Sequence, residues 1–297
     1  MKIKKYAAID IGSNGVRLLV VNVILEPNTP AIFRKSALVR VPIRLGADTF
    51  NKGFISEHNA HRMCNAMKAF ELLMQVHGVE KYRACATSAM REASNAQEVV
   101  TKIKKESNVQ IDIIDGKTEA AIIAATDLYE LLEEQKNYLY IDVGGGSTEF
   151  TLFSNGKLME SKSFKLGTVR SLDSQQDLSE AWLRAKSWVK DGVTKYPNCT
   201  IIGSGGNINK VFKLSARKIG KPLAYAYLKE QYKKYKNLSY EERIRIMGLN
   251  PDRADVIIPA LKIYLSAMKW AKADQIVVPK IGLADGIVKM LFSEEHL

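Results

Sequence analysis

The chain has 297 residues, of which 46% are apolar, so it can bury a substantial core and is long enough for two domains. It has no run of about eighteen apolar residues. Lys2 to Lys5 lead into a strand with no apolar signal core, so we expect a cytoplasmic protein with no membrane partner. Its three cysteines, Cys64, Cys85 and Cys199, are widely spaced, which favours reduced thiols over disulfides or a cysteine metal site.

The first predicted element is a strand that ends in a short loop of small residues. Ala7 to Ile11 is apolar around Asp10, the loop contains Gly12, Ser13 and Asn14, and Val16 to Val23 resumes the strand pattern. The pattern returns 132 positions later, where an apolar strand ends at Asp142 and Val143. An alternating strand then runs onward from Glu149. The residues of this second loop are Gly144, Gly145, Gly146, Ser147 and Thr148.

Both loops are predicted to bind phosphate. Glycine has no Cβ, so backbone N–H groups can approach an anion closely, and the hydroxyls of Ser147 and Thr148 add donors. For either loop taken alone, a plain turn is the alternative. Asp142, at a strand end, suits a magnesium ion or its bound water. Two such hairpins predict a duplicated α/β fold with a cleft, the layout of the actin, sugar kinase and Hsp70 ATPase superfamily, with ribonuclease H-like lobes.

The remainder of the first half alternates strands and helices. We expect a strand over 31–43, a helix from Ser56 to Gly78, a strand over 81–87, and a long helix from about 115 past Leu131. Arg91 follows a strand end, where its guanidinium can face phosphate oxygens, although a surface ion pair is the alternative. Glu119 lies in the first turn of the long helix, facing the same cleft, unless it only offsets the helix dipole.

The second half carries the densest positive charge. After strands near 159–166 and 200–203, residues 206–236 hold nine Lys and Arg against one acid. Such a segment can concentrate a polyanion, although a solvated helix face is the alternative. We place the lobes at 1–124 and 125–297, hinged near 124 and again near the C-terminus. The candidate polyanion track consists of Lys165, Arg170, Lys210, Lys213 and Arg217.

Motifs spread over nearly the whole chain resemble one known family, the exopolyphosphatase and guanosine pentaphosphate phosphohydrolase (Ppx/GppA) family. They are Asp10 to Asn14, Ala86 to Arg91, Gly116 to Ala120, Asp142 to Glu149, Leu166 to Arg170, Arg253 to Asp255 and Gly282 to Gly286. The resemblance implies an enzyme that uses Mg²⁺ (or Mn²⁺) to remove the terminal phosphate of inorganic polyphosphate. Guanosine pentaphosphate is the alternative substrate, and a homodimer is also implied.

The resemblance implies a role for each candidate residue. Glu119 is the general base and Arg91 a phosphate clamp. Asp142 and Glu149 form the acidic side of the metal and water site, and Asp10 is a further metal candidate. A noncatalytic polyphosphate sensor and a nucleic-acid binder are the rival interpretations, but no nucleic-acid-binding signature supports specific nucleic-acid recognition.

Some positions depart from the family pattern. Gly15 stands where serine is common, Ala121 where arginine is usual, Ala260 replaces a frequent glycine, and Ala284 interrupts a Gly-Leu-Arg-x-Gly stretch. The chain resembles a short, two-domain form of the family, because it ends after the second lobe. We therefore expect it to act on shorter polyphosphates or less processively, with the lysines of 206–236 supplying part of the track.

Overall fold

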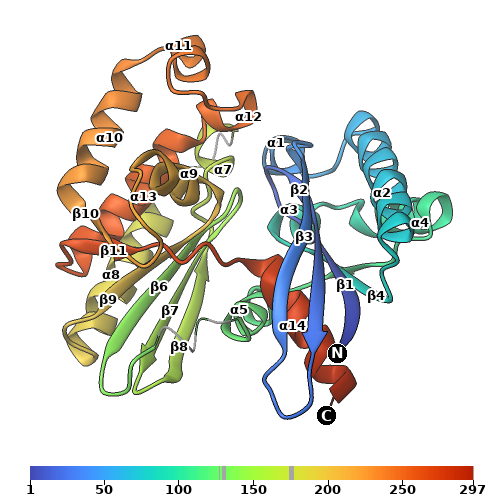
Figure 1. Cartoon of the computed structure of the whole chain (residues 1–297). Coiled ribbons are helices and arrows are strands. Elements are labelled where there is room, and N and C mark those ends of the chain that lie inside the picture. The colour runs from blue at the N-terminus through green and yellow to red at the C-terminus, as the bar shows by residue number, and fades with distance from the viewer. Residues whose placement is uncertain (127, 129–131, 174–176, 297) are drawn as a thin grey trace. The chain divides into compact units, whose positions relative to one another are not determined.

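A computed structural model describes every residue except 127, 129–131, 174–176 and 297. The chain divides into two compact units, Met1–Thr126 together with Gly282–Leu297, and Asp127–Ile281 (Figure 1). The first crossing lies two residues beyond the predicted boundary at 124. Residues 282–297, which were expected in the second lobe, belong to the first unit instead, because their helix packs against its sheet.

The first unit is built on a five-stranded sheet of order β3-β2-β1-β4-β5. β1 pairs antiparallel with β2, and β2 with β3, whereas β1, β4 and β5 are parallel. The apolar run of β1 explains its central place, because Tyr6 to Ile9 are fully buried. The strands are β1 (Lys2–Ile11), β2 (Val16–Leu25), β3 (Ile32–Val41), β4 (Lys81–Ala86) and β5 (Ile111–Ile113).

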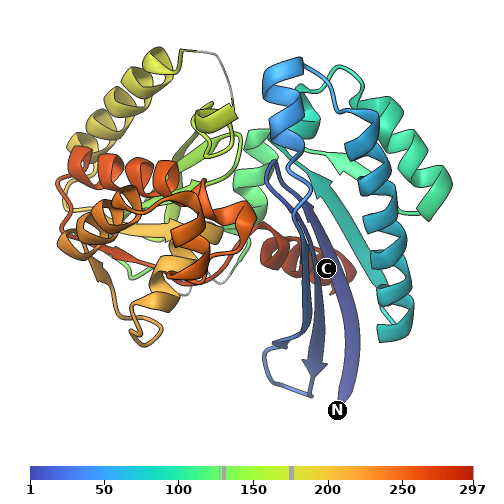
Figure 2. The same ribbon diagram turned by 90° about the horizontal axis from the view of Figure 1, so that it is seen from above.

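Helices cover both faces of this sheet, with α2 and α4 on one side and α5 and α14 on the other (Figures 1 and 2). The predicted cap of α2 is confirmed, since the Ser56 side chain accepts the Asn59 amide at 3.3 Å. α5 ends earlier than predicted, and Leu131 lies outside the described residues. The helices are α1 (Leu45–Lys52), α2 (Glu57–His77), α3 (Ser88–Glu92), α4 (Ala96–Ser107), α5 (Gly116–Ala124) and α14 (Leu283–His296).

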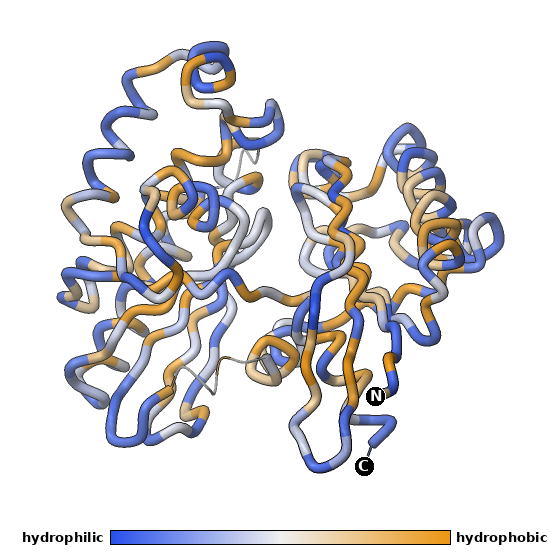
Figure 3. The backbone as a smooth tube through the Cα atoms, in the orientation of Figure 1, coloured by the Kyte–Doolittle hydropathy of each residue, from blue (hydrophilic) through white to orange (hydrophobic). Residues whose placement is uncertain are grey.

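The second unit has a six-stranded sheet of order β10-β11-β9-β6-β7-β8. Its core brings together Leu139 and Ile141 of β6, Phe150 and Leu152 of β7 and residues of the covering helices. Figure 3 shows apolar residues along the central strands and hydrophilic ones along much of α10. The strands are β6 (Asn137–Val143), β7 (Thr148–Ser154), β8 (Lys157–Phe164), β9 (Thr200–Ser204), β10 (Leu223–Ala224) and β11 (Gln275–Val277).

The helices of the second unit range from the four residues of α7 and α12 to the seventeen of α8. Arg243 of α11 ties three segments together, because its guanidinium donates to the carbonyl oxygens of Tyr235, Leu238 and Ala254, each at 2.8 Å. The helices are α7 (Arg170–Asp173), α8 (Ser179–Lys195), α9 (Gly206–Leu214), α10 (Tyr225–Asn237), α11 (Tyr240–Arg245), α12 (Pro251–Ala254) and α13 (Ile257–Trp270). No helix in the described ranges has both the length and the apolarity to cross a membrane.

The two sheets repeat one topology, which confirms the predicted duplication of an α/β fold. In each unit an antiparallel three-stranded meander continues into parallel strands, so β3-β2-β1-β4-β5 corresponds to β8-β7-β6-β9-β11. The two glycine loops join equivalent strands, β1 to β2 and β6 to β7. An equivalent hydrogen bond closes each loop. The Gly12 amide donates to the Gly15 carbonyl oxygen at 3.2 Å, and the Gly144 amide donates to the Ser147 carbonyl oxygen at 2.9 Å.

Candidate functional site

The second glycine loop is held from one side by the segment 167–170, which leads into α7. The carbonyl oxygens of Gly144, Gly145 and Gly146 all accept hydrogen bonds from this segment. The distances are 3.0 Å from Thr168 N to the Gly144 oxygen, 2.8 and 3.0 Å from Val169 N and Arg170 N to the Gly145 oxygen, and 2.8 Å from Arg170 Nε to the Gly146 oxygen.

These hydrogen bonds to the loop carbonyls fix the direction in which the amides of the loop point. In a planar trans peptide the C=O and the following N–H point in opposite directions, and no described peptide bond is cis. The N–H groups of Gly145, Gly146 and Ser147 therefore face away from segment 167–170. None of the three has a backbone carbonyl partner among the described residues. Successive amides turned to one side form a concave site that suits a phosphate.

Two residues of the backing segment are committed to the loop. A Cβ on Gly167 would lie 2.2 Å from the Gly145 carbonyl oxygen, so only glycine fits there. Arg170 is 1% exposed, and its guanidinium holds the loop from behind. This differs from the expectation that Arg170 belongs to a polyanion track, because a buried side chain bonded to a carbonyl offers no surface charge.

The hydroxyls of the second loop are used within the protein. Ser147 donates to Glu149 Oε1 at 2.6 Å, and Thr148, fully buried, donates to the Leu166 carbonyl oxygen. A hydroxyl has a single proton to donate. In this arrangement the backbone amides, and not these hydroxyls as expected, are the donors that the loop offers to an anion.

Two carboxylates stand beside the loop on adjacent strands. Asp142 and Glu149 are direct partners in the β6–β7 register, so both side chains lie on the same face. Burial raises the pKa of the Tyr140 phenol, and the charges of Asp142 and Glu149 add to this effect. Two neighbouring carboxylates attract a cation, and Mg²⁺ usually binds through one or two carboxylates plus waters. These residues fit magnesium, although no group of three or more acidic, histidine or cysteine ligands occurs in the described chain.

The first glycine loop has a similar backing, here from the segment that leads into α1. The Ser13 carbonyl oxygen accepts the Gly46 amide at 2.8 Å, and the Asn14 carbonyl oxygen accepts the Arg44 amide at 3.2 Å. By the same peptide geometry, the amides of Asn14 and Gly15 face away from that segment. The Ser13 hydroxyl bonds to the Ser88 hydroxyl at 2.9 Å and links the loop to α3.

Asp10 lies at the base of the first loop and already has a cationic neighbour. Arg17, its partner in the β1–β2 register, donates to Asp10 Oδ2 at 3.0 Å. Burial raises the pKa of Asp10, while Arg17 and Arg40 oppose that shift. Asp10, a predicted metal candidate, thus has the Arg17 guanidinium as a charged neighbour in the structure.

Sequence reasoning missed Arg40, which lies opposite Arg17 in the β2–β3 register. A Cβ added to Gly15 would lie 2.9 Å from the Arg40 guanidinium, so Arg40 covers the space that a serine side chain would need. The departure from the family pattern at Gly15 was the available signal. The glycine indicated that a serine side chain is missing at position 15, and in the structure the Arg40 guanidinium occupies that space.

Arg91 and Glu119 come together in the first unit as predicted from their strand ends. Arg91 Nη1 lies 3.8 Å from Glu119 Oε2 and donates to the Ile114 carbonyl oxygen at 2.6 Å. Glu119 is buried in the first turn of α5. Burial raises the pKa of the Cys85 thiol to about 11, and among smaller effects the charges of Asp10 and Glu119 raise it further. Both carboxylates thus lie near the carboxyl end of β4.

The rest of the predicted track lies on other elements of the second unit, and Gly205, which directly follows β9, lies close to Asp142. Lys213 and Arg217 are exposed on and after α9, and Lys210 reaches the Gly248 carbonyl oxygen at 2.9 Å. Lys165 is exposed at the end of β8. Gly205, with a left-handed φ of 118°, has Asp142 Oδ1 3.3 Å from the place of a Cβ.

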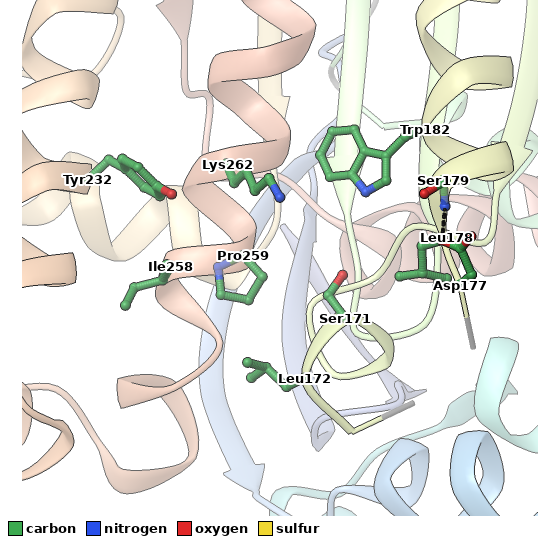
Figure 4. A pocket seen from close by; sticks show the side chains of 10 residues that line it. All are labelled: Ser171, Leu172, Asp177, Leu178, Ser179, Trp182, Tyr232, Ile258, Pro259 and Lys262. Carbon is green, nitrogen blue, oxygen red and sulfur yellow. Dashed lines mark hydrogen bonds between the residues drawn. The ribbon is translucent and has the colours of Figure 1, made fainter. Parts of the chain in front are cut away.

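A separate pocket of about 530 Å³ opens on the second unit (Figure 4). Figure 4 shows Trp182, Tyr232 and Lys262 around it, and Lys262 Nζ lies 5.3 Å from the centre of the Trp182 ring. Trp182 also packs edge-on against Trp270. None of the sequence-predicted site residues lines this pocket.

The duplicated α/β architecture with its two glycine loops is that of the actin-like ATPase fold. Among solved structures, the chain resembles the Aquifex aeolicus member of the Ppx/GppA family, with a TM-score of 0.76, 26% identity and full coverage of both chains. It also has the fold of an exopolyphosphatase from Cytophaga hutchinsonii, with a TM-score of 0.85, 23% identity and 98% coverage of both.

The sequence model of the Ppx/GppA phosphatase family matches residues 32–295, and the chain belongs to that family. A bifunctional 3-dehydroquinate synthase/phosphatase of Fusobacterium nucleatum is 29% identical, over 92% of this chain and 44% of that protein. A guanosine-5'-triphosphate,3'-diphosphate pyrophosphatase of Photobacterium profundum is 24% identical, over 97% of this chain and 59% of that protein. The chain thus spans about half the length of these relatives.

Proposed function

We propose that this protein is a phosphoanhydride hydrolase that releases the terminal phosphate of inorganic polyphosphate. The observation that carries the proposal is the loop 144–147, whose carbonyls are bound from behind so that three successive amides face the other way. The loop 12–15 repeats this device with two amides. Preorganised N–H groups stabilise the charge of a transferred phosphoryl group without reorganising.

The chain also offers the groups that hydrolysis requires. Glu119 accepts the proton of the attacking water, and Arg91, 3.8 Å away, binds a phosphate oxygen. The Ile114 carbonyl anchors the Arg91 side chain and so limits its reach. Asp142 and Glu149 would hold a magnesium ion, which when bound neutralises charge on the phosphate chain. Asp10 instead forms an ion pair with Arg17 and supports the first loop.

Exposed cations of the second unit supply the attraction for a polyanion in this proposal. Lys165, Lys213 and Arg217 are exposed, and α10 carries further lysines. A long-range attraction of this kind lowers KM and weakens with salt, because it acts through screened charges. Arg170 is removed from this set by its burial.

Guanosine pentaphosphate is the second candidate substrate. It is favoured by the Photobacterium relative, whose name specifies a guanosine-5'-triphosphate,3'-diphosphate pyrophosphatase. Both substrates end in a phosphoanhydride, so the same amides and carboxylates serve either reaction.

The test is orthophosphate release, with magnesium, from short polyphosphate, long polyphosphate, guanosine pentaphosphate and ATP. We expect the highest kcat/KM on polyphosphate and a KM that rises with salt. Phosphate release from guanosine pentaphosphate alone would make that nucleotide the substrate, and the proposed reaction, hydrolysis of a phosphoanhydride, would be unchanged. Tight binding of polyphosphate without any release would contradict the proposal and indicate a noncatalytic sensor.

A further inference from the structure

The Glu149 carboxylate accepts hydrogen bonds from two hydroxyls, one that precedes it in the chain and one that follows it. Oε1 accepts a hydrogen bond from Ser147 at 2.6 Å and from Ser163 at 2.7 Å. Glu149 is 3% exposed, whereas Ser163 lies on β8 at the edge of the sheet and is exposed. A nearly buried carboxylate is thus oriented by a side chain that reaches in from the surface.

The duplicated fold shows how the surroundings of this carboxylate differ from those of the equivalent position in the first unit. In the first unit, the residue opposite the strand-end Asp10 is Arg17, and charge attraction fixes the two side chains. The equivalent residue opposite Asp142 is Glu149, and two carboxylates repel one another. Hydroxyl donors to one oxygen of Glu149 fix its rotamer without cancelling its charge.

We propose that Ser163 is a positioning residue, whose hydroxyl, with that of Ser147, holds the Glu149 carboxylate in its working orientation beside the phosphate loop. The inference rests on the proposed hydrolase function and names a residue that the motifs did not include. Ser163 acts through Glu149 and does not contact the substrate. Its effect therefore belongs to turnover rather than to substrate affinity.

The chain contains a matched control on the same two strands. Ser161 lies two residues before Ser163 on β8, points to the same face and is also exposed. Its hydroxyl bonds to the Thr151 hydroxyl at 2.9 Å. Thr151 and Ser161 are register partners, as Glu149 and Ser163 are. Removing the Ser161 hydroxyl breaks a cross-strand bond of similar length that involves no carboxylate.

The experiment compares Ser163→Ala, Ser163→Thr and Ser161→Ala in the full chain by steady-state phosphate release and thermal unfolding. For Ser163→Ala we expect kcat to fall about tenfold, the worth of a modest hydrogen bond to a charged group, with KM changed less than about twofold. Ser163→Thr keeps a hydroxyl and should restore most of kcat. Ser161→Ala should match the wild type, and all three variants should unfold close to the wild-type temperature.

Several results would overturn the assignment. Equal losses in Ser163→Ala and Ser161→Ala would indicate a general effect of the edge strand. A rise in KM with kcat unchanged would make Ser163 a substrate contact and not a positioning residue. If Ser163→Ala has the kcat and KM of the wild type, Ser163 has no positioning role, and the hydrolase proposal is unaffected. If the wild-type protein itself releases no phosphate from any substrate, the proposed function fails, and the positioning role fails with it.

Discussion

Arg17 and Glu149 occupy equivalent places in the two halves of the duplicated fold, each directly opposite an aspartate that is the penultimate residue of the preceding strand. The exchange of a cation for an anion makes the halves electrostatically different. Asp10 forms an ion pair with Arg17 in the first unit, whereas the register of the second unit places a second carboxylate, that of Glu149, opposite Asp142. In the proposed hydrolase, Asp142 and Glu149 are the residues that would hold a magnesium ion.

Gly167→Ala should disable the second phosphate loop. A Cβ there would come within 2.2 Å of the Gly145 carbonyl oxygen and 2.3 Å of the Gly146 carbonyl carbon, and both atoms belong to backbone. The loop must shift, and its amides lose their shared direction. We expect phosphate release to fall at least about a hundredfold, similar to the loss of a preorganised donor.

The control for this prediction is Gly156→Ala, in the hairpin between β7 and β8. Its φ of 70° disfavours alanine, but a Cβ there would meet nothing within 4 Å. That variant should lose about 1 kcal/mol of unfolding free energy and keep its activity. Normal activity in Gly167→Ala would contradict the assignment of the loop.

Gly286→Ala should loosen the packing of α14 against α5 within the first unit. The added Cβ would lie 2.0 Å from the Ile122 carbonyl oxygen, so α14 and α5 must move apart. We expect a loss of about 2 kcal/mol or more in the free energy of unfolding, measured by urea denaturation. Gly282→Ala, where a Cβ meets nothing within 4 Å, is the control and should change little. Equal stability of the two variants would show that the helices do not pack this closely.

Glu295→Gln should destabilise the protein only above acidic pH. Hydrogen bonds from Lys4 and Tyr6 lower the pKa of Glu295 from 4.5 to about 2. A carboxyl with a lowered folded-state pKa contributes stability above its unfolded pKa, and the contribution disappears as the pH falls through the folded value. The difference in melting temperature between wild type and variant should therefore be constant near pH 7 and shrink as the pH falls from 4.5 towards 2.

The neighbouring Glu294→Gln is the matched control for this pH dependence. Glu294 lies 3.7 Å from Arg83 and is more exposed than Glu295, so its removal should have a smaller effect. A pH-independent difference for Glu295→Gln would show that the effect comes from packing and not from the charge.

Gly15 and Arg40 should show energetic coupling in a double-mutant cycle. Gly15→Ser alone forces its Cβ to within 2.9 Å of the Arg40 guanidinium and 3.1 Å of the Val41 carbonyl oxygen. Removing Arg40 frees part of that space, so Gly15→Ser with Arg40→Ala should cost less than the sum of the single changes. We expect a coupling of about 1 kcal/mol in urea denaturation. Additive effects would show that Arg40 does not occupy the space beside Gly15.

Repetition made the main architecture predictable. Two hairpins of the same pattern 132 residues apart indicated a duplicated α/β fold, and β1–β2 and β6–β7 confirm it. The helix cap at Ser56 followed from local chemistry alone. Arg91 and Glu119 could be paired because each follows a parallel strand, and such ends meet at one edge of a sheet.

Long-range contacts decided what the sequence could not show. Arg170 resembles an exposed cation in sequence, but it is buried because the loop carbonyl of Gly146 needs a donor. Arg40 is an ordinary basic residue of β3 until the register places it beside Gly15. The return of α14 to the first unit depends on Tyr6 and Phe292, which meet edge to face from opposite ends of the chain.

The most direct test of the hydrolase account is the turnover of Glu119→Gln on polyphosphate, measured beside Glu98→Gln. Both residues are acids in the first turn of a helix, so the pair separates catalysis from the helix dipole. We predict that Glu119→Gln keeps polyphosphate binding and loses about two to four orders of magnitude in kcat, while Glu98→Gln stays at the wild-type rate. Near-normal turnover by Glu119→Gln would contradict the account.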